Sequence, residues 1–175
     1  AQHAEDEGIS LGTINSNTFQ DDDYLLGSIC APDARVRRKA VDHLLECIDI
    51  MDQIGSRDLK LWFADGTNYP GQDDIRARQD RLAEGLQEVY ARLGEDQRMV
   101  LEYKFFEPAF YTTDVPDWGV SYAHCLKLGP KAKVVVDGVK FDAPLAETDR
   151  SWTARFAKNG KKWELVSDSA IRTSP

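Results

Sequence analysis

The chain has 175 residues, of which 42% are hydrophobic and 30% are charged, a balance typical of soluble globular proteins. It is long enough for one ordinary domain but short for a complete (β/α)8 barrel, which takes about 250 residues. A net charge of −8 argues against general binding of nucleic acids or anionic membranes, since both need a basic surface.

Three cysteines, Cys30, Cys47 and Cys125, lie far apart without a Cys-x-x-Cys spacing. This pattern indicates neither a structural zinc site nor a disulfide framework. The N-terminus has no basic-then-apolar signal pattern, and there is no apolar run of the length needed to span a membrane. We therefore expect a cytoplasmic protein.

Short β-rich runs alternate with long amphipathic segments along most of the chain. The expected strands are 9–14, 58–63, 99–104 and 132–137, and the expected helices are 35–54, 73–93 and 118–128. Repeated strand–helix–strand units predict parallel strands with the helices packed outside. Because no Gly-x-Gly-x-x-Gly motif or P-loop occurs, the pattern favours an α/β fold of the partial (β/α)8 TIM-barrel type over a nucleotide-binding sheet.

The pattern changes after Asp137, because residues 138–175 show no helical period. Two alternating runs, 152–156 and 163–166, flank Asn159-Gly160, the preferred dipeptide for a two-residue type I′ turn. Such a turn would place Phe156 opposite Trp163. The sequence thus predicts a β/α part over residues 1–137 and a C-terminal β-hairpin tail over 138–175.

Reactive groups of parallel β/α proteins gather at the carboxyl ends of the strands. The residues that the expected strands place there are Asn15, Asn17, Trp62, Asp65, Glu102, Lys104 and Asp137. Side chains two apart on a strand share a face, so Glu102 and Lys104 should point into the same interior. A buried ion pair between those two, and a turn or capping role for Asp137, are the structural alternatives.

Five stretches resemble, in order and spacing, the L-rhamnose isomerase family of xylose-isomerase-like barrels. They are Asn15-Ser16-Asn17-Thr18-Phe19, Leu45-Glu46-Cys47-Ile48, the run from Leu61-Trp62-Phe63 to Pro70-Gly71-Gln72, Glu107-Pro108-Ala109-Phe110-Tyr111 and Leu128-Gly129-Pro130-Lys131-Ala132. The resemblance spans residues 1–137 and leaves the tail unmatched.

The resemblance implies an aldose–ketose isomerase that uses divalent metal, usually manganese, to convert L-rhamnose to L-rhamnulose or to act on a related sugar. Glu102 and Asp137 match carboxylates that bind metal, and hard divalent ions do prefer such oxygen ligands. Lys104 matches a lysine that contacts a substrate oxygen, which makes Lys104 and Glu102 the candidate catalytic residues. Trp62 matches an aromatic residue of the sugar pocket, with Phe19 and Asn17 near it.

The chain also departs from that family. Asp137 is followed by Gly138-Val139-Lys140, where the family has a Gly-His-His stretch whose first histidine binds metal. A histidine ligand from an earlier strand and the histidine and aspartate ligands of later strands have no counterpart. We therefore expect the chain alone to bind metal weakly and to be inactive unless a further chain completes the site.

Two other interpretations stay open. In the first, the chain is a noncatalytic truncated or fused fragment. In the second, it is a carbohydrate-binding accessory module built around Trp152 and Trp163. The expected partner is a small-molecule sugar, with no nucleic acid or membrane. Self-association is also expected, because members of the resembled family assemble as tetramers.

Overall fold

A computed structural model describes residues 2–67, 72–104, 112–136, 139–141, 155–159 and 162–167. The chain forms two compact units, Ala1–Leu145 and Ala146–Pro175. The boundary falls beyond Asp137 because β7 (Val139–Phe141) pairs antiparallel with β6 (Ala132–Val136) and so belongs to the first unit. Asp137 itself lies outside the described residues.

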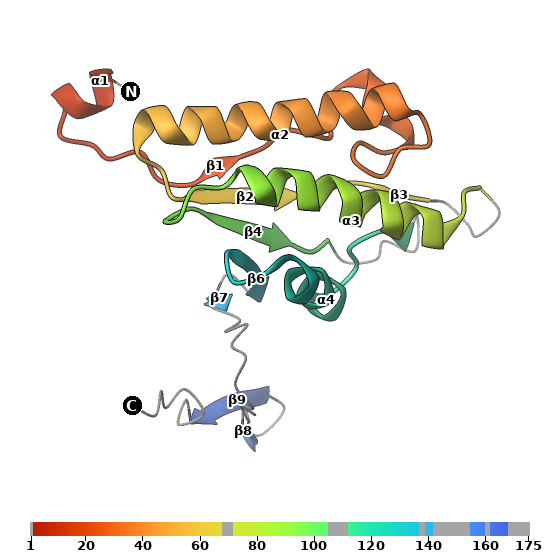
Figure 1. The fold of residues 1–175 in the computed structure, drawn as a ribbon. Coiled ribbons are helices and arrows are strands. Elements are labelled where there is room, and N and C mark those ends of the chain that lie inside the picture. The colour runs from red at the N-terminus through yellow and green to blue at the C-terminus, as the bar shows by residue number, and fades with distance from the viewer. Residues whose placement is uncertain are drawn as a thin grey trace. The chain divides into compact units, whose positions relative to one another are not determined.

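The first unit is built on one five-stranded sheet with the order β1-β2-β4-β6-β7 (Figure 1). The strands β1 (Ile14–Asn15), β2 (Asp58–Trp62), β4 (Arg98–Glu102) and β6 are parallel, each to the next. The prediction of four parallel strands joined by helices is therefore confirmed. Antiparallel β7 was not predicted.

Three long helices connect these strands: α2 (Ala34–Ile54), α3 (Ile75–Arg92) and α4 (Trp118–Leu128). Each begins at an aspartate, Asp33, Asp74 or Asp117, whose carboxylate accepts hydrogen bonds from backbone amides of the first turn. Such N-caps provide hydrogen-bond acceptors for amides that have no partner within the helix. Their negative charge also interacts favourably with the positive end of the helix dipole. Two short helical pieces, α1 (Gln2–Asp6) and η1 (Asp22–Leu26), precede α2.

The core lies between the helices and one face of the sheet. Along β2 and β4, alternate residues are fully buried against the helices, whereas their neighbours face the other way. The strand residues of the core are Leu59, Leu61, Met99, Leu101, Ala132 and Val134, and the largest helix residues that meet them are Leu44, Ile48, Met51, Leu82, Leu86 and Val89. Figure 1 shows α2 and α3 running side by side along the strands.

Close packing between α3 and the segment before α2 depends on Gly85. A Cβ atom at Gly85 would lie 2.5 Å from Cγ1 and 2.6 Å from Cδ1 of Ile29. Both Ile29 and Gly85 are buried. A glycine in the middle of a helix is costly in conformational entropy, and here it allows the Ile29 side chain to sit against the helix backbone.

The first predicted strand, 9–14, is much shorter in the structure, where only Ile14 and Asn15 pair. Ile14 lies opposite Leu59, one residue after β2 begins, so the segment before Thr13 extends past the start of its neighbour. Ile9 and Leu11 are accordingly exposed. The sequence alternates over 9–14, but in the described part of the chain only the end of this run has a pairing strand.

The second unit contains the predicted hairpin, β8 (Arg155–Asn159) and β9 (Lys162–Ser167), but with a different register. Phe156 lies opposite Leu165, and Trp163 lies opposite Lys158, so the predicted pairing of Phe156 with Trp163 is wrong. Asn159, predicted as a turn residue, is instead the ladder partner of Lys162. A slip of two partner positions preserves the period-two alternation of a sequence, which is why the pattern did not exclude it.

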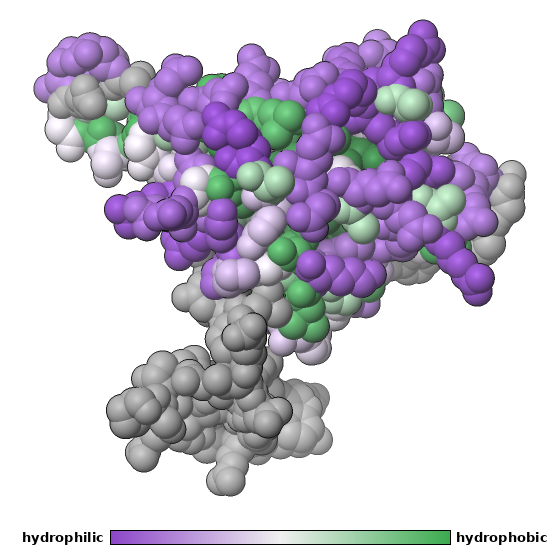
Figure 2. Space-filling view, viewed as in Figure 1, coloured by the Kyte–Doolittle hydropathy of each residue, from purple (hydrophilic) through white to green (hydrophobic). Residues whose placement is uncertain are grey.

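Among the described residues, no helix is both long and apolar enough to cross a membrane. Figure 2 shows mainly hydrophilic residues on the visible face of the first unit, with smaller hydrophobic areas between them.

Candidate functional site

The predicted site residues of β2 and β4 lie beside one another at the carboxyl end of the sheet. Trp62 and Glu102 end their strands and are direct partners in the ladder. Lys104 follows two residues later, with its Nζ atom 5.2 Å from the centroid of the Trp62 ring. Phe19, from the loop after β1, packs edge-on against Trp62 with ring centroids 4.9 Å apart. The cluster presents two aromatic rings and a cation at one place.

The carboxylate of Glu102 is paired with Lys60, whose Nζ lies 2.8 Å from Glu102 Oε2. The expected alternative, an ion pair between Glu102 and Lys104, is therefore not the pairing that the structure has. The sequence did not identify Lys60 as the partner of Glu102. Its position two residues before Trp62 indicated only that the two side chains lie on the same face of the strand. Both side chains are about one third exposed, 36% for Lys60 and 31% for Glu102, so they remain accessible to a ligand.

Asn17 holds the loop that carries Phe19. Its backbone amide donates a hydrogen bond to Nε2 of His43 on α2 at 3.2 Å, and its side-chain amide donates to Oε1 of Gln20 at 2.7 Å. Asn15 lies next to Lys60 in the ladder and is exposed. In this structure, Asn17 thus braces the loop through the outer helix α2.

Asp65 is buried and serves the loop before α2. Its carboxylate accepts hydrogen bonds from the Ser28 amide at 2.7 Å, the Ser28 hydroxyl at 2.6 Å and the Cys30 amide at 2.9 Å. Burial raises the pKa of Asp65, although these hydrogen bonds act against the rise. Asp65 thus fixes a segment more than thirty residues earlier in the chain.

Next to Asp65 lies a second buried group, the ion pair between Arg78 of α3 and Asp114. Arg78 Nη2 lies 2.7 Å from Asp114 Oδ2, and Arg78 Nη1 lies 3.0 Å from Asp73 Oδ2. Partial burial acts to raise the pKa of Asp73, but hydrogen bonds from Arg78 and from the Asp74 amide lower it overall. Sequence reasoning missed this group, since Arg78 occupies an ordinary position of an amphipathic helix.

Two groups of side chains contain atoms of the kind that bind metals. In neither group do the described residues form a site that fits a metal ion. The ligand atoms of Cys30, Asp65 and Asp114 lie within 4.8 Å of one another, but Asp65 Oδ2 accepts from two amides and Oδ1 from the Ser28 hydroxyl. Arg78 donates to both oxygens of Asp114. Burial raises the pKa of the Cys30 thiol well above its ordinary value, so it stays protonated. The carboxyl-end cluster offers one described carboxylate, Glu102, because Asp137 lies outside the described residues.

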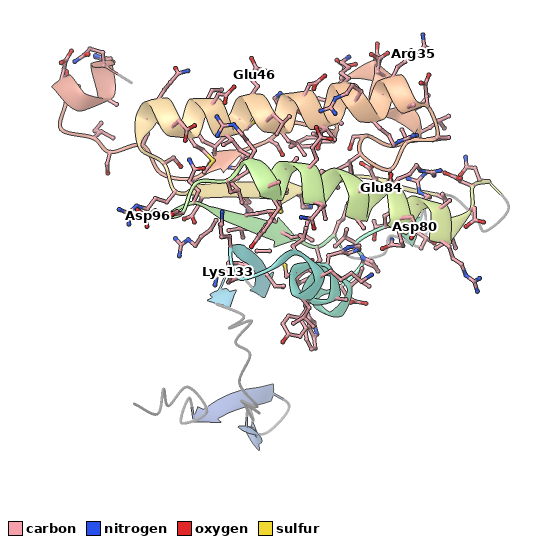
Figure 3. The ribbon with its side chains drawn as sticks, viewed as in Figure 1. Arg35, Glu46, Asp80, Glu84, Asp96 and Lys133 are labelled. Carbon is pink, nitrogen blue, oxygen red and sulfur yellow. The ribbon has the colours of Figure 1, made fainter. Side chains whose placement is uncertain are left out.

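A hollow of about 1230 Å³ lies along the outer side of α2, and Trp62 is not among the residues that line it. Its lining includes Asn17, Tyr24 and His43, and it is rimmed by charged residues such as Arg35 and Glu46, which Figure 3 labels on α2. Lys39 is one of the residues that line the hollow, and its ammonium lies over the Tyr24 ring. It forms ion pairs with Asp21 and Asp23. This hollow is a charged surface groove beside the helix.

Two relatives in sequence are named as probable sugar isomerases. The chain is 43% identical over 135 residues to a probable sugar isomerase of Rhizobium meliloti and 42% identical over 135 residues to one of Mesorhizobium japonicum. Each alignment covers 74% of this chain but only 31% of the relative, so the chain spans about a third of the length of these proteins. A scan against models of known protein families finds no match.

Similar solved structures include L-ribulose 3-epimerase, with a TM-score of 0.57 and 16% identity over 76% of this chain and 42% of that one. Another is 3-keto-D-glucoside 4-epimerase from E. coli, with a TM-score of 0.57 and 12% identity over 76% of this chain and 50% of that one. At such identities the likeness concerns the fold alone. The chain is similar to sugar isomerases in sequence and to sugar epimerase TIM barrels in fold.

Proposed function

We propose that this chain supplies one wall of the active site of an aldose–ketose sugar isomerase, with L-rhamnose and L-rhamnulose, or a related sugar pair, as substrate and product. The observation that carries the proposal is the cluster of Phe19, Trp62 and Lys104 beside Glu102 at the carboxyl end of the sheet. The identity of 43% to a probable sugar isomerase supports it independently.

Each residue of the cluster has a chemical role in this proposal. The Trp62 indole offers a flat apolar face for the C–H side of a sugar, and Phe19 packs against the indole with its ring perpendicular to it. The Lys104 ammonium donates hydrogen bonds to a sugar oxygen and stabilises negative charge that develops there as hydrogen moves between C1 and C2. Glu102 accepts hydrogen bonds from a hydroxyl, and Lys60 balances its charge.

The proposal includes a divalent metal, manganese in the resembled family, that Glu102 and Asp137 would hold together with ligands from outside this chain. The described residues do not form a metal site by themselves, so no step of the reaction is derived through the ion. Two carboxylates leave most of the coordination shell to water. We therefore expect weak binding of Mn²⁺ and no turnover of L-rhamnose by the chain alone.

A sugar titration tests the proposal without requiring turnover. In the ¹⁵N-labelled chain, the indole N–H signal of Trp62 should shift on addition of L-rhamnose, whereas that of Trp118, an exposed residue of α4, should not. Trp62→Ala should abolish sugar binding, and Trp118→Ala should leave it unchanged. A Trp62 signal that ignores both L-rhamnose and L-rhamnulose would overturn the proposal.

Calorimetric titration with Mn²⁺ separates the sugar wall from the metal shell. Trp62→Ala should weaken sugar binding more than metal binding, whereas Glu102→Gln should weaken the already poor Mn²⁺ binding. Tight stoichiometric binding of Mn²⁺ with steady turnover would show that the chain has a complete site, contrary to the proposal of a partial one.

A further inference from the structure

Arg78 is a buried cation whose hydrogen bonds fix the segment before α4. The side chain is 2% exposed, although it projects from α3 among loops at the carboxyl end of the sheet. Its Nε and Nη2 atoms donate to both oxygens of Asp114 at 2.7 to 3.0 Å. A two-pronged guanidinium–carboxylate pair of this kind fixes both position and orientation of the carboxylate.

The residues on either side of Asp114 hold the backbone of Lys104. The Thr113 hydroxyl donates to the Lys104 carbonyl oxygen at 2.7 Å, and the Lys104 amide donates to the Val115 carbonyl oxygen at 2.9 Å. The Asp114 amide in turn donates to the Asp65 carbonyl oxygen at 3.0 Å. Lys104 is therefore attached on both its amide and its carbonyl side to the segment that Arg78 fixes.

The sheet itself does not set the position of Lys104. The ladder between β2 and β4 ends at Trp62 and Glu102, and the ladder between β4 and β6 ends at Leu101. Beyond Glu102, the loops after β2 and β4 pair instead, through β3 (Gly66–Thr67) and β5 (Thr112–Thr113). Thr113 belongs to this small ladder, which joins Asp65 and Asp114.

We propose that Arg78 and Asp114 are positioning residues that hold Lys104 over the Trp62 ring. The ion pair fixes the segment Thr113–Val115, this segment fixes the Lys104 backbone, and the ammonium then lies 5.2 Å from the ring centroid. This inference rests on the proposed function, because only a Lys104 that meets the sugar gives the ion pair a part in the reaction.

The Trp62 indole N–H signal of the sugar-free 175-residue chain tests the inference. Lys104→Met defines the signal position when the ammonium is absent. Arg78→Met and Asp114→Asn should each move the signal from its wild-type position toward that reference. Asp114→Asn keeps the size of the side chain but turns an amide toward Arg78, so it decides the question if Arg78→Met does not fold.

Arg81→Met is the matched control. Arg81 projects from the same helix and pairs with the same Asp73 at 2.6 Å, but it makes no hydrogen bond to Asp114 among the described contacts. We expect its Trp62 signal to stay at the wild-type position. The Trp118 signal and urea unfolding report on the fold of every variant.

Two outcomes would overturn the inference. One is a Trp62 signal at the wild-type position in folded Asp114→Asn; the other is the same displacement in Arg81→Met as in Arg78→Met, which would indicate only a general loss of packing. Because these measurements use no sugar, they can fail while the sugar titration succeeds. A wild-type chain that binds no sugar but shows the expected displacements would instead contradict only the proposed function.

Discussion

The two faces of the same strands differ in composition and in exposure. Along β2, Leu59 and Leu61 are fully buried against the helices, whereas Lys60 and Trp62 on the other face are partly exposed. On β4, Leu101 is buried against the helices and Glu102 is partly exposed, although Val100, on the same face as Glu102, is also buried. One face of each strand therefore packs against the helices, and the other carries residues of the proposed sugar site. A substitution should affect either packing or the proposed site, depending on which face its side chain lies on.

The largest expected effect comes from the helix-covered face. Leu61→Ala removes a fully buried side chain and leaves a cavity that the surrounding helices fill only partly. We expect the free energy of unfolding to fall by about 2–5 kcal/mol. Urea unfolding followed by far-UV circular dichroism measures this loss.

Lys60→Ala, one residue earlier on the other face, is the matched control for Leu61→Ala. It removes an ion pair with Glu102 in which both side chains are about one third exposed, so the free energy of unfolding should fall by less than about 1 kcal/mol. Equal losses in the two variants would contradict the division of the strand into a packing face and a binding face.

A smaller loss is expected where α3 meets the segment before α2. Gly85→Ala places a methyl group against Ile29, and overpacking of this kind costs about 1–3 kcal/mol. Part of that cost is offset by the better helix propensity of alanine, roughly 1 kcal/mol. The double variant Gly85→Ala with Ile29→Ala tests the cause, since the cost of the alanine at position 85 should vanish once Ile29 is shortened.

The smallest expected effect is a dependence of the free energy of unfolding on pH, caused by a histidine among the buried residues of α4. His124 of α4 is buried, and this burial, with a contribution from Lys127, lowers the pKa of its imidazole below 6.5. The unfolded chain then binds a proton more readily than the folded chain, so stability is complete above about pH 6.5 and falls as the pH drops through the folded pKa.

Urea midpoints at about pH 7.5 and pH 5.5 measure this dependence. His124→Gln removes the titrating group and keeps an amide N–H near Oε1 of Gln79, which lies 2.9 Å from His124 Nε2 in the structure. The variant should lose less stability than the wild type between the two pH values. The same loss in both proteins would assign the dependence to other groups.

Local pattern predicted the helices well. The expected range 118–128 coincides with α4, and α2 begins one residue before the expected start at Arg35. An apolar stripe with a period near 3.6 is a property of consecutive residues, so it needs no knowledge of the partner. Strand limits and pairings were harder, as the short β1, the unexpected β7 and the hairpin register show.

The candidate site was predictable in its place but not in its contacts. Trp62 and Glu102 were placed at the carboxyl ends of neighbouring strands, and the ladder makes them direct partners. An ion pair between Glu102 and Lys104 was the structural alternative, because the two share a strand face, whereas the structure pairs Glu102 with Lys60 on the adjacent strand. The metal and substrate roles given to these residues stay predictions.

The amino-acid sequence by itself determined which elements form, which face of each is apolar and which residues stand where the strands end, because these properties follow from local periodicity and chain geometry. Only the tertiary structure decided which charges meet. Arg78 and Asp114 are more than thirty residues apart in the chain, as are Asp65 and Ser28. Such pairs depend on how helices and loops pack around the end of the sheet, and burial there makes their hydrogen bonds specific, since an unpaired charge in that place would be costly.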